Sequence, residues 1–117
     1  PMSTKAEVRD KVAFKLGIKV AGQSLSNRYA SDLDDAYDEV HANLEALDLV
    51  TWASAAEVPA EFVSHVVSLI ALTRVTEYAV SGVRLSGIVS AASQAKSRIR
   101  ELISDPYFNS AEGAVYF

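Results

Sequence analysis

The 117-residue sequence contains no cysteine, only two histidines and only three prolines. The absence of cysteine excludes disulfide bonds, thiolate metal sites and thiol catalysis. Because His41 and His65 are the only imidazoles, a zinc site or a histidine-based general base has very few available members. We therefore predict that the protein is not an enzyme, and we expect no catalytic residue, no metal and no cofactor.

Positive charge is also scarce, because 11 Lys and Arg residues face 15 Asp and Glu residues and the formal net charge is −4. A chain without a basic excess is not expected to act mainly by gripping duplex DNA. Half of the residues are hydrophobic, and this composition indicates a folded core. At this length we expect one core in a soluble domain. Pro1 precedes Met2, and we interpret it as the remnant of an expression tag.

Hydrophobic periodicity and end signals predict four helices with short polar connections. Thr4 and Glu7 form a capping-box pattern before the first helix, and Gly17 is suited to end it. The predicted helices cover residues 5–16, about 26–48, about 59–80 and about 86–104. The sequence therefore predicts an all-α fold, in which a compact bundle of four main helices (residues 1–104) precedes an extended C-terminal arm (residues 105–117).

Acidic residues concentrate on one side of the second predicted helix, opposite its apolar stripe. They include Asp34, Asp35, Asp38 and Glu45. Nothing apolar surrounds the aspartates in the sequence pattern to raise a carboxyl pKa, so acid–base catalysis by paired carboxylates is not favoured. A solvated face or the wall of a pore is the better interpretation.

The third predicted helix is unusual because 12 of its 19 residues between positions 62 and 80 are apolar and occupy every side. His65, Arg74 and Glu77 interrupt the segment, which argues against a membrane span. We therefore expect other helices and a neighbouring subunit to cover this helix. The candidates for the subunit interface are Val67, Ala71 and Val75.

Spacing on two predicted helices weakly suggests a metal site. Asp38 lies three residues before His41, and Glu61 lies four residues before His65. Carboxylate-bridged metal bundles need a Glu-x-x-His on each of two helices and further inward-pointing glutamates. Only fragments of that pattern are present, so we interpret these residues as solvated or structural.

Basic residues gather on the first and fourth predicted helices. They are Lys5, Arg9, Lys11, Lys15 and Lys19 on the first helix, and Lys96, Arg98 and Arg100 on the fourth. Nucleic-acid contact is one interpretation of these residues, although charged helix faces are usually solvated.

The C-terminal arm contains two aromatic pairs, Tyr107–Phe108 and Tyr116–Phe117, after the helix-stopping pair Asp105–Pro106. Two interpretations remain open for the arm. It packs against its own bundle, or it docks on another chain, for which exposed aromatic residues are suitable anchors.

Several features along the chain together carry a resemblance to a known family. They are the segment Lys15-Leu16-Gly17-Ile18, the turn Gly22-Gln23-Ser24, Leu44 and Leu47 in the long helix, Trp52, Val58-Pro59 before the apolar helix, and the Ala- and Arg-bearing fourth helix. In this order they resemble the small α-helical head-to-tail adaptors of tailed bacteriophages, also called connector, head-completion or packaged-DNA stabilisation proteins. The resemblance covers most of the chain, and it is one of pattern and not of a catalytic motif.

This resemblance implies a structural protein of the virion neck that is made in the host cytoplasm. Such adaptors form a homo-oligomeric ring of about twelve copies beneath the portal protein and extend the DNA channel toward the tail. They contribute to viral assembly, DNA packaging and DNA ejection, help to retain packaged DNA, and dock the tail or a stopper or nozzle protein.

The resemblance also suggests roles for particular residues. The candidate channel-lining residues are Asp34, Asp35, Asp38 and Glu45, because a negative wall repels phosphate and lets DNA pass without sequence-specific contact. The candidate arm residues that bind the portal or a neighbour are Tyr107, Phe108, Tyr116 and Phe117. The alternative is a stand-alone helical module that binds nucleic acid or protein through its basic faces, with no ring and no membrane.

Overall fold

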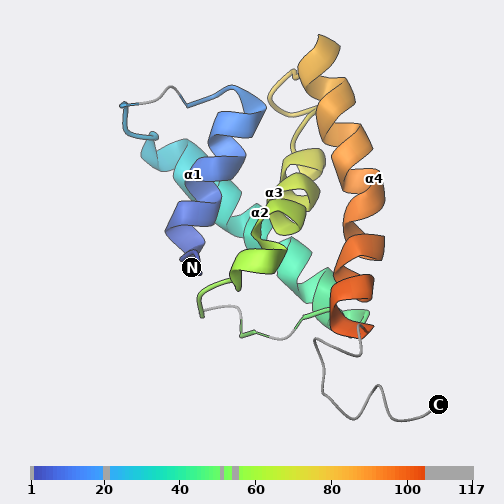
Figure 1. Cartoon of the computed structure of the whole chain (residues 1–117). Helices are drawn as coiled ribbons and strands as arrows, with labels where there is room; N and C mark the ends of the chain where they lie inside the picture. The colour runs from blue at the N-terminus through green and yellow to red at the C-terminus, as the bar shows by residue number, and fades with distance from the viewer. Residues whose placement is uncertain (1, 20–21, 51, 54–55, 105–117) are drawn as a thin grey trace, which may run out of the picture.

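The computed structural model describes residues 2–19, 22–50, 52–53 and 56–104 (Figure 1). Within these ranges there are four helices and no strand: α1 (Lys5–Leu16), α2 (Asn27–Ala46), α3 (Ala60–Thr73) and α4 (Gly82–Ser104). The predicted all-α class is therefore confirmed. The predicted arm, residues 105–117, lies outside the described residues.

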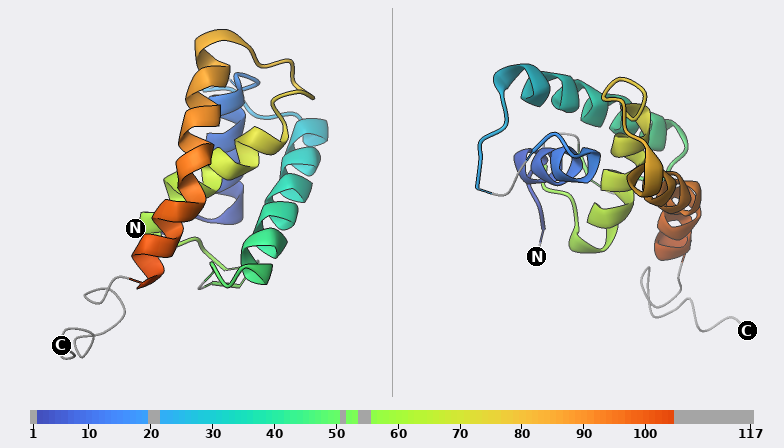
Figure 2. Two further views of the ribbon diagram at one scale, coloured as in Figure 1. Left: turned by 90° about the vertical axis from the view of Figure 1, so that its right-hand side faces the viewer. Right: turned by 90° about the horizontal axis from the view of Figure 1, so that it is seen from above.

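α3 lies at the centre of the bundle, where it contacts each of the other three helices (Figure 2). α1 and α4 meet each other only over a few residues. The apolar character of α3 on every side thus has a structural reason, because its different sides pack against different helices. No helix in the described part of the chain is long and apolar enough to cross a membrane.

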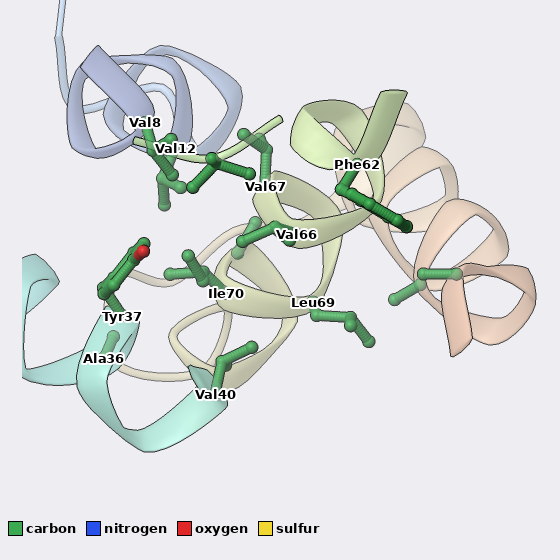
Figure 3. Packing of buried hydrophobic residues seen from close by; sticks show 14 of the residues in the cluster. Val8, Val12, Ala36, Tyr37, Val40, Phe62, Val66, Val67, Leu69 and Ile70 are labelled. Atoms are coloured by element: carbon green, nitrogen blue, oxygen red, sulfur yellow. The ribbon is translucent and has the colours of Figure 1, made fainter. Parts of the chain in front are cut away.

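The side chains of α3 point in several directions into the core (Figure 3). Val67 lies toward Val12 of α1, and Ile70 lies toward Tyr37 of α2. Phe62 points toward α4. All five side chains are at most 6% exposed, and complete burial of one such apolar side chain contributes roughly 1.5–3 kcal/mol. The chain itself therefore supplies most of the cover that α3 needs.

Local signals set both ends of α1. The Thr4 amide donates to Glu7 Oε1 at 2.8 Å, and the Glu7 amide donates to Thr4 Oγ1 at 3.1 Å, which completes the capping box. At the other end Gly17 is left-handed with a φ of 84°, and the Ile18 amide donates to the Ala13 carbonyl at 3.0 Å. The predicted limits of this helix are confirmed.

The prediction for the end of the third helix is wrong. α3 ends at Thr73 and not near Val80, and α4 begins at Gly82, earlier than expected. Between the two helices, Arg74 and Tyr78 turn toward α2 and bond with its acidic side chains. Because these partners are distant in sequence, helical periodicity does not reveal where the helix stops.

A buried aromatic cluster holds the linker between α2 and α3. Because a carbonyl only accepts, His41 Nε2–H donates to the Trp52 carbonyl, at 2.9 Å. Trp52 Nε1 in turn donates to the Tyr37 hydroxyl at 3.3 Å, and the Trp52 ring stacks on Phe62 with 5.3 Å between the centroids. His41 is therefore a hydrogen-bonded core residue.

The N-terminal residues are tied to the segment that leads into α3. The Ser3 amide donates to the Val58 carbonyl at 3.0 Å, and the Val58 amide donates to the Ser3 carbonyl at 2.7 Å. This isolated bridge pairs two stretches of backbone that would otherwise need water as a partner. It fixes the start of α1 beside the start of α3.

Candidate binding groove

The acidic side chains of α2 are divided between two flanks of the helix. On the flank facing α1, Lys5 Nζ lies 2.9 Å from Asp38 Oδ1, and Arg9 Nη1 lies 3.2 Å from Asp34 Oδ2. The hydrogen bond with Asp38 raises the pKa of the Lys5 ammonium. These pairs tie α1 to α2, and they occupy two of the basic side chains of α1.

The opposite flank of α2 holds the segment that follows α3. Arg74 Nε lies 3.2 Å from Asp32 Oδ2, and Arg74 Nη2 lies 3.3 Å from Glu39 Oε2. The Tyr78 hydroxyl donates to Asp32 Oδ2 at 2.5 Å. Burial opposes ionisation of Asp32, but the bonds from Tyr78 and Arg74 outweigh it and lower the pKa of this carboxyl. The cluster therefore fixes the chain between α3 and α4 onto α2.

The four candidate channel-lining residues are not equivalent in the structure. Asp34 and Asp38 face α1 in the ion pairs described above. Asp35 and Glu45 are exposed, and neither forms an ion pair with another described residue. Asp38 also keeps more than half of its side chain exposed despite its ion pair. The lining role stays a prediction, and Asp35 and Glu45 are the exposed members of the set without an ion pair to another described residue.

The candidate subunit-interface residues lie mostly inside the bundle. Ala71 is fully buried, Val67 is 6% exposed, and Val75 is half-buried against the core. While this packing holds, Val67 and Ala71 offer little surface to a second copy, so their interface role stays a prediction. The predicted arm residues lie outside the described residues: Tyr107, Phe108, Tyr116 and Phe117.

The other basic side chains of α1 line a groove that α1, α3 and α4 form together, with α3 as its floor. Figure 1 shows α3 between α1 and α4. We call it the basic groove, and its volume is about 750 Å³. Its basic lining residues are Lys11, Lys15, His65 and Arg98, and its apolar lining includes Phe14, Val63, Val67 and Ala91. No acidic side chain is among its described lining residues.

Helical spacing brings these side chains to the groove. Lys11, Phe14 and Lys15 are three and four residues apart and share one face of α1. Ala91 and Arg98 are seven residues, or about two turns, apart on α4. The sequence predicted these basic residues but not their convergence, and Phe14, which is 58% exposed, was not among the candidate residues. The face of α1 that Phe14 shares with Lys11 and Lys15 is the sequence signal that indicates it.

The basic groove is positively charged at neutral pH. Burial, together with the nearby charge of Arg98, lowers the pKa of His65, so its imidazole is neutral at pH 7. Arg98 Nη1 lies 3.5 Å from Glu101 Oε1, but both side chains are more than half exposed, and such pairs contribute little. Among the described lining residues, Lys11, Lys15 and Arg98 therefore keep positive charge above a partly apolar floor, to which α3 contributes Ala60, Val63 and Val67 beside Ser64, His65 and Ser68.

Arg84 of α4 holds the end of α1 beside the groove. Its Nη1 donates to the carbonyls of Phe14 and Lys15 at 3.2 Å and 3.0 Å. A cation at a helix C-terminus satisfies carbonyls that lack helical partners and interacts favourably with the helix dipole. The contact joins the two walls of the basic groove at one end.

The two histidines occupy separate environments. His41 bonds with the Trp52 carbonyl in the core, whereas His65 lines the basic groove. Among the residues that the structure describes, no group of three or more His, Asp or Glu side chains is placed to hold a metal ion. The chemistry that the groove offers is the binding of a negatively charged and partly apolar partner.

Comparisons of the chain with known protein families, with curated proteins and with solved structures find no match. The described part of the chain is an all-α helical bundle with a basic groove on a partly apolar floor.

Proposed function

We propose that the protein is a structural head-to-tail adaptor of a tailed bacteriophage. In this role it forms a ring of about twelve copies beneath the portal protein and extends the DNA channel in the virion neck. It helps to retain packaged DNA and docks the tail or its stopper or nozzle protein. The observation that carries the proposal is the basic groove, together with the exposed apolar side chains beside it.

Two large apolar side chains are exposed next to the cationic residues of α1 and α4. Phe14 at the groove is 58% exposed, and Val83, which lies beside Lys15 and Arg84, is 90% exposed. Apolar anchors within a polar rim are typical of protein–protein interfaces. This surface supports a protein that works in an assembly.

The burial of Val67 and Ala71 affects where a neighbour would bind. A contact between copies, or between the protein and the portal, needs side chains that the bundle leaves accessible. We therefore assign the assembly contact to the basic groove and its apolar rim. Asp35 and Glu45, which are exposed and form no ion pair with another described residue, are then the acidic residues that we assign to the channel, where they would repel the phosphates of passing DNA.

Native mass spectrometry of the protein with portal rings from the same phage tests the proposal. The double variant Lys15→Glu, Arg98→Glu should lose assembly on the ring, because it reverses two charges of the groove. The control Arg28→Glu, Arg100→Glu makes the same change in net charge at exposed sites outside the groove and should assemble normally. If the unmodified protein does not bind portal rings but binds DNA tightly, the adaptor function is wrong.

The alternative is a stand-alone module that binds nucleic acid through the same groove. The observation that favours it is the set of three cations without an acidic lining residue among those described. If all three contact phosphates of duplex DNA, the logarithm of the affinity should fall against the logarithm of salt with a slope of about −3. This slope, its loss in the groove variant and a monomeric protein would together favour the module.

A further inference from the structure

The basic groove requires an occupant with two properties. Lys11, Lys15 and Arg98 favour negative charge, whereas Val63 on the floor and the exposed ring of Phe14 on the wall favour apolar side chains. A small hydrated anion would meet the first requirement and leave the floor uncovered. An acidic segment with large apolar side chains meets both requirements.

Residues 105–117 have this chemistry, with the sequence DPYFNSAEGAVYF. The segment contains two acidic residues, Asp105 and Glu112, no Lys or Arg, and four aromatic residues. Aromatic side chains bury the largest apolar areas of all side chains. The charge and the apolar content of the segment are therefore complementary to the groove.

The segment also starts at the helix that forms one wall of the groove. Along α4, at about 1.5 Å per residue, Arg98 lies about 9 Å and Ala91 about 20 Å before Ser104. Thirteen extended residues span at most about 47 Å, so the segment is long enough to return along the groove. Pro106 cannot continue the helix, which allows the chain to reverse after Ser104.

Covalent attachment favours the groove of the same chain over that of another copy. A tethered segment has an effective concentration in the millimolar range for a short connection, far above that of a second copy in dilute solution. We propose that residues 105–117 bind in the basic groove of their own chain, with the acidic side chains near Lys15 and Arg98. This proposal does not depend on the adaptor function, and in an adaptor the groove would hold the segment until a competing partner displaced it.

Disulfide trapping in the 117-residue chain tests this docking, since its sequence has no cysteine to interfere. One cysteine replaces Gln94, an exposed groove residue, and the other replaces Ser110 of the segment. Under mild oxidation this Gln94→Cys, Ser110→Cys protein should form a disulfide within one chain, seen as a faster monomer band on a non-reducing gel. The control Ala42→Cys, Ser110→Cys places the first cysteine at an exposed site on α2 outside the groove and should stay largely reduced.

Charge reversal in the groove is the second part of the experiment. Addition of Lys15→Glu and Arg98→Glu to the trapping pair should slow disulfide formation by roughly fivefold, because two rim charges are reversed. Circular dichroism of each variant before oxidation confirms that the helices are intact. Equal trapping in the groove and control proteins, no effect of charge reversal, or disulfides only between two chains would each overturn docking within the chain.

Discussion

At the scale of single residues, Tyr78 combines burial with a short hydrogen bond to a carboxylate. Its hydroxyl donates to Asp32 at 2.5 Å, and its ring packs edge-on against Tyr29 with 5.4 Å between the centroids. Burial and the Asp32 carboxylate together raise the pKa of Tyr78 above its ordinary value, which favours the protonated hydroxyl as the donor in this bond. The hydroxyl and the Arg74 guanidinium are the partners that keep Asp32 ionised.

We predict that Tyr78→Phe lowers the free energy of unfolding by about 1–2 kcal/mol, because Asp32 loses a donor while remaining partly buried. Urea denaturation at pH 7 measures the change. Tyr29→Phe is the matched control, because it removes a tyrosine hydroxyl for which no hydrogen bond is found among the described residues, and its effect should be within about 0.5 kcal/mol. Equal midpoints for Tyr78→Phe and the unmodified protein would contradict the role of this bond.

His65 predicts a dependence of stability on pH. Its pKa in the folded chain is below the ordinary value of 6.5. Between the two values the unfolded chain binds a proton that the folded chain does not, so the free energy of unfolding falls as the pH drops through this window. His65→Gln should make the decline between about pH 7.5 and about pH 5 shallower. Urea midpoints at the two pH values measure it, and parallel declines in both proteins would rule out His65 as a source.

At the scale of helices, the backbone conformation requires glycine at position 17 but not at position 87. Gly17 ends α1 with a φ of 84°, and an added Cβ would lie 3.2 Å from the Arg84 guanidinium. Gly87 lies inside α4, where an added Cβ would meet nothing within 4 Å. A left-handed backbone costs a residue with a side chain roughly 1–2 kcal/mol, whereas glycine within a helix costs about 0.5–1 kcal/mol relative to alanine.

We therefore expect the same substitution to act in opposite directions at the two sites. Gly17→Ala should destabilise the protein by about 1–2 kcal/mol, and Gly87→Ala should stabilise it by about 0.5 kcal/mol. Thermal unfolding of the two variants side by side measures both changes. The prediction fails if Gly17→Ala is as stable as the unmodified protein.

At the scale of the whole molecule, some acidic side chains of α2 form ion pairs with neighbouring segments, whereas Asp35 and Glu45 are exposed and form none with another described residue. Two double variants each remove two negative charges from α2. One combines Asp34→Asn with Asp38→Asn, and the other combines Asp35→Asn with Glu45→Gln. The first breaks two ion pairs with α1 and should cost about 0.5–1.5 kcal/mol in total, because the pairs are partly exposed. The second should leave stability unchanged within about 0.5 kcal/mol.

Chemical denaturation of these two variants at low and high salt separates the roles. The cost of the first variant should shrink at high salt, since screening weakens exposed pairs in the unmodified protein. Equal stability of the two variants would mean that the flank pairs do not hold α1 to α2. The free energy of unfolding reports the ion pairs between α1 and α2 directly, and its interpretation does not depend on whether α2 lines a channel.

The sequence by itself determined the features that depend on neighbours within a few positions. The capping box at Thr4 and Glu7 and the left-handed Gly17 involve contacts within one turn, so their residue types alone predict α1. The same reasoning predicted the all-α class and the apolar stripe of α2, because burial repeats with the helical period.

Only the tertiary structure decided which charges meet. Asp34 and Asp38 pair with α1, and Arg74, directly after the end of α3, pairs with α2, through contacts between residues that are 25 to 42 positions apart. The basic groove likewise needs α1, α3 and α4 to pack together before Lys15, His65 and Arg98 converge. A helical pattern shows which side of each helix is apolar, but the pairing of polar sides is set by how the helices pack. The physical reason is that hydrogen bonds and ion pairs act over a few ångströms, and the fold alone brings residues so distant in sequence within that range.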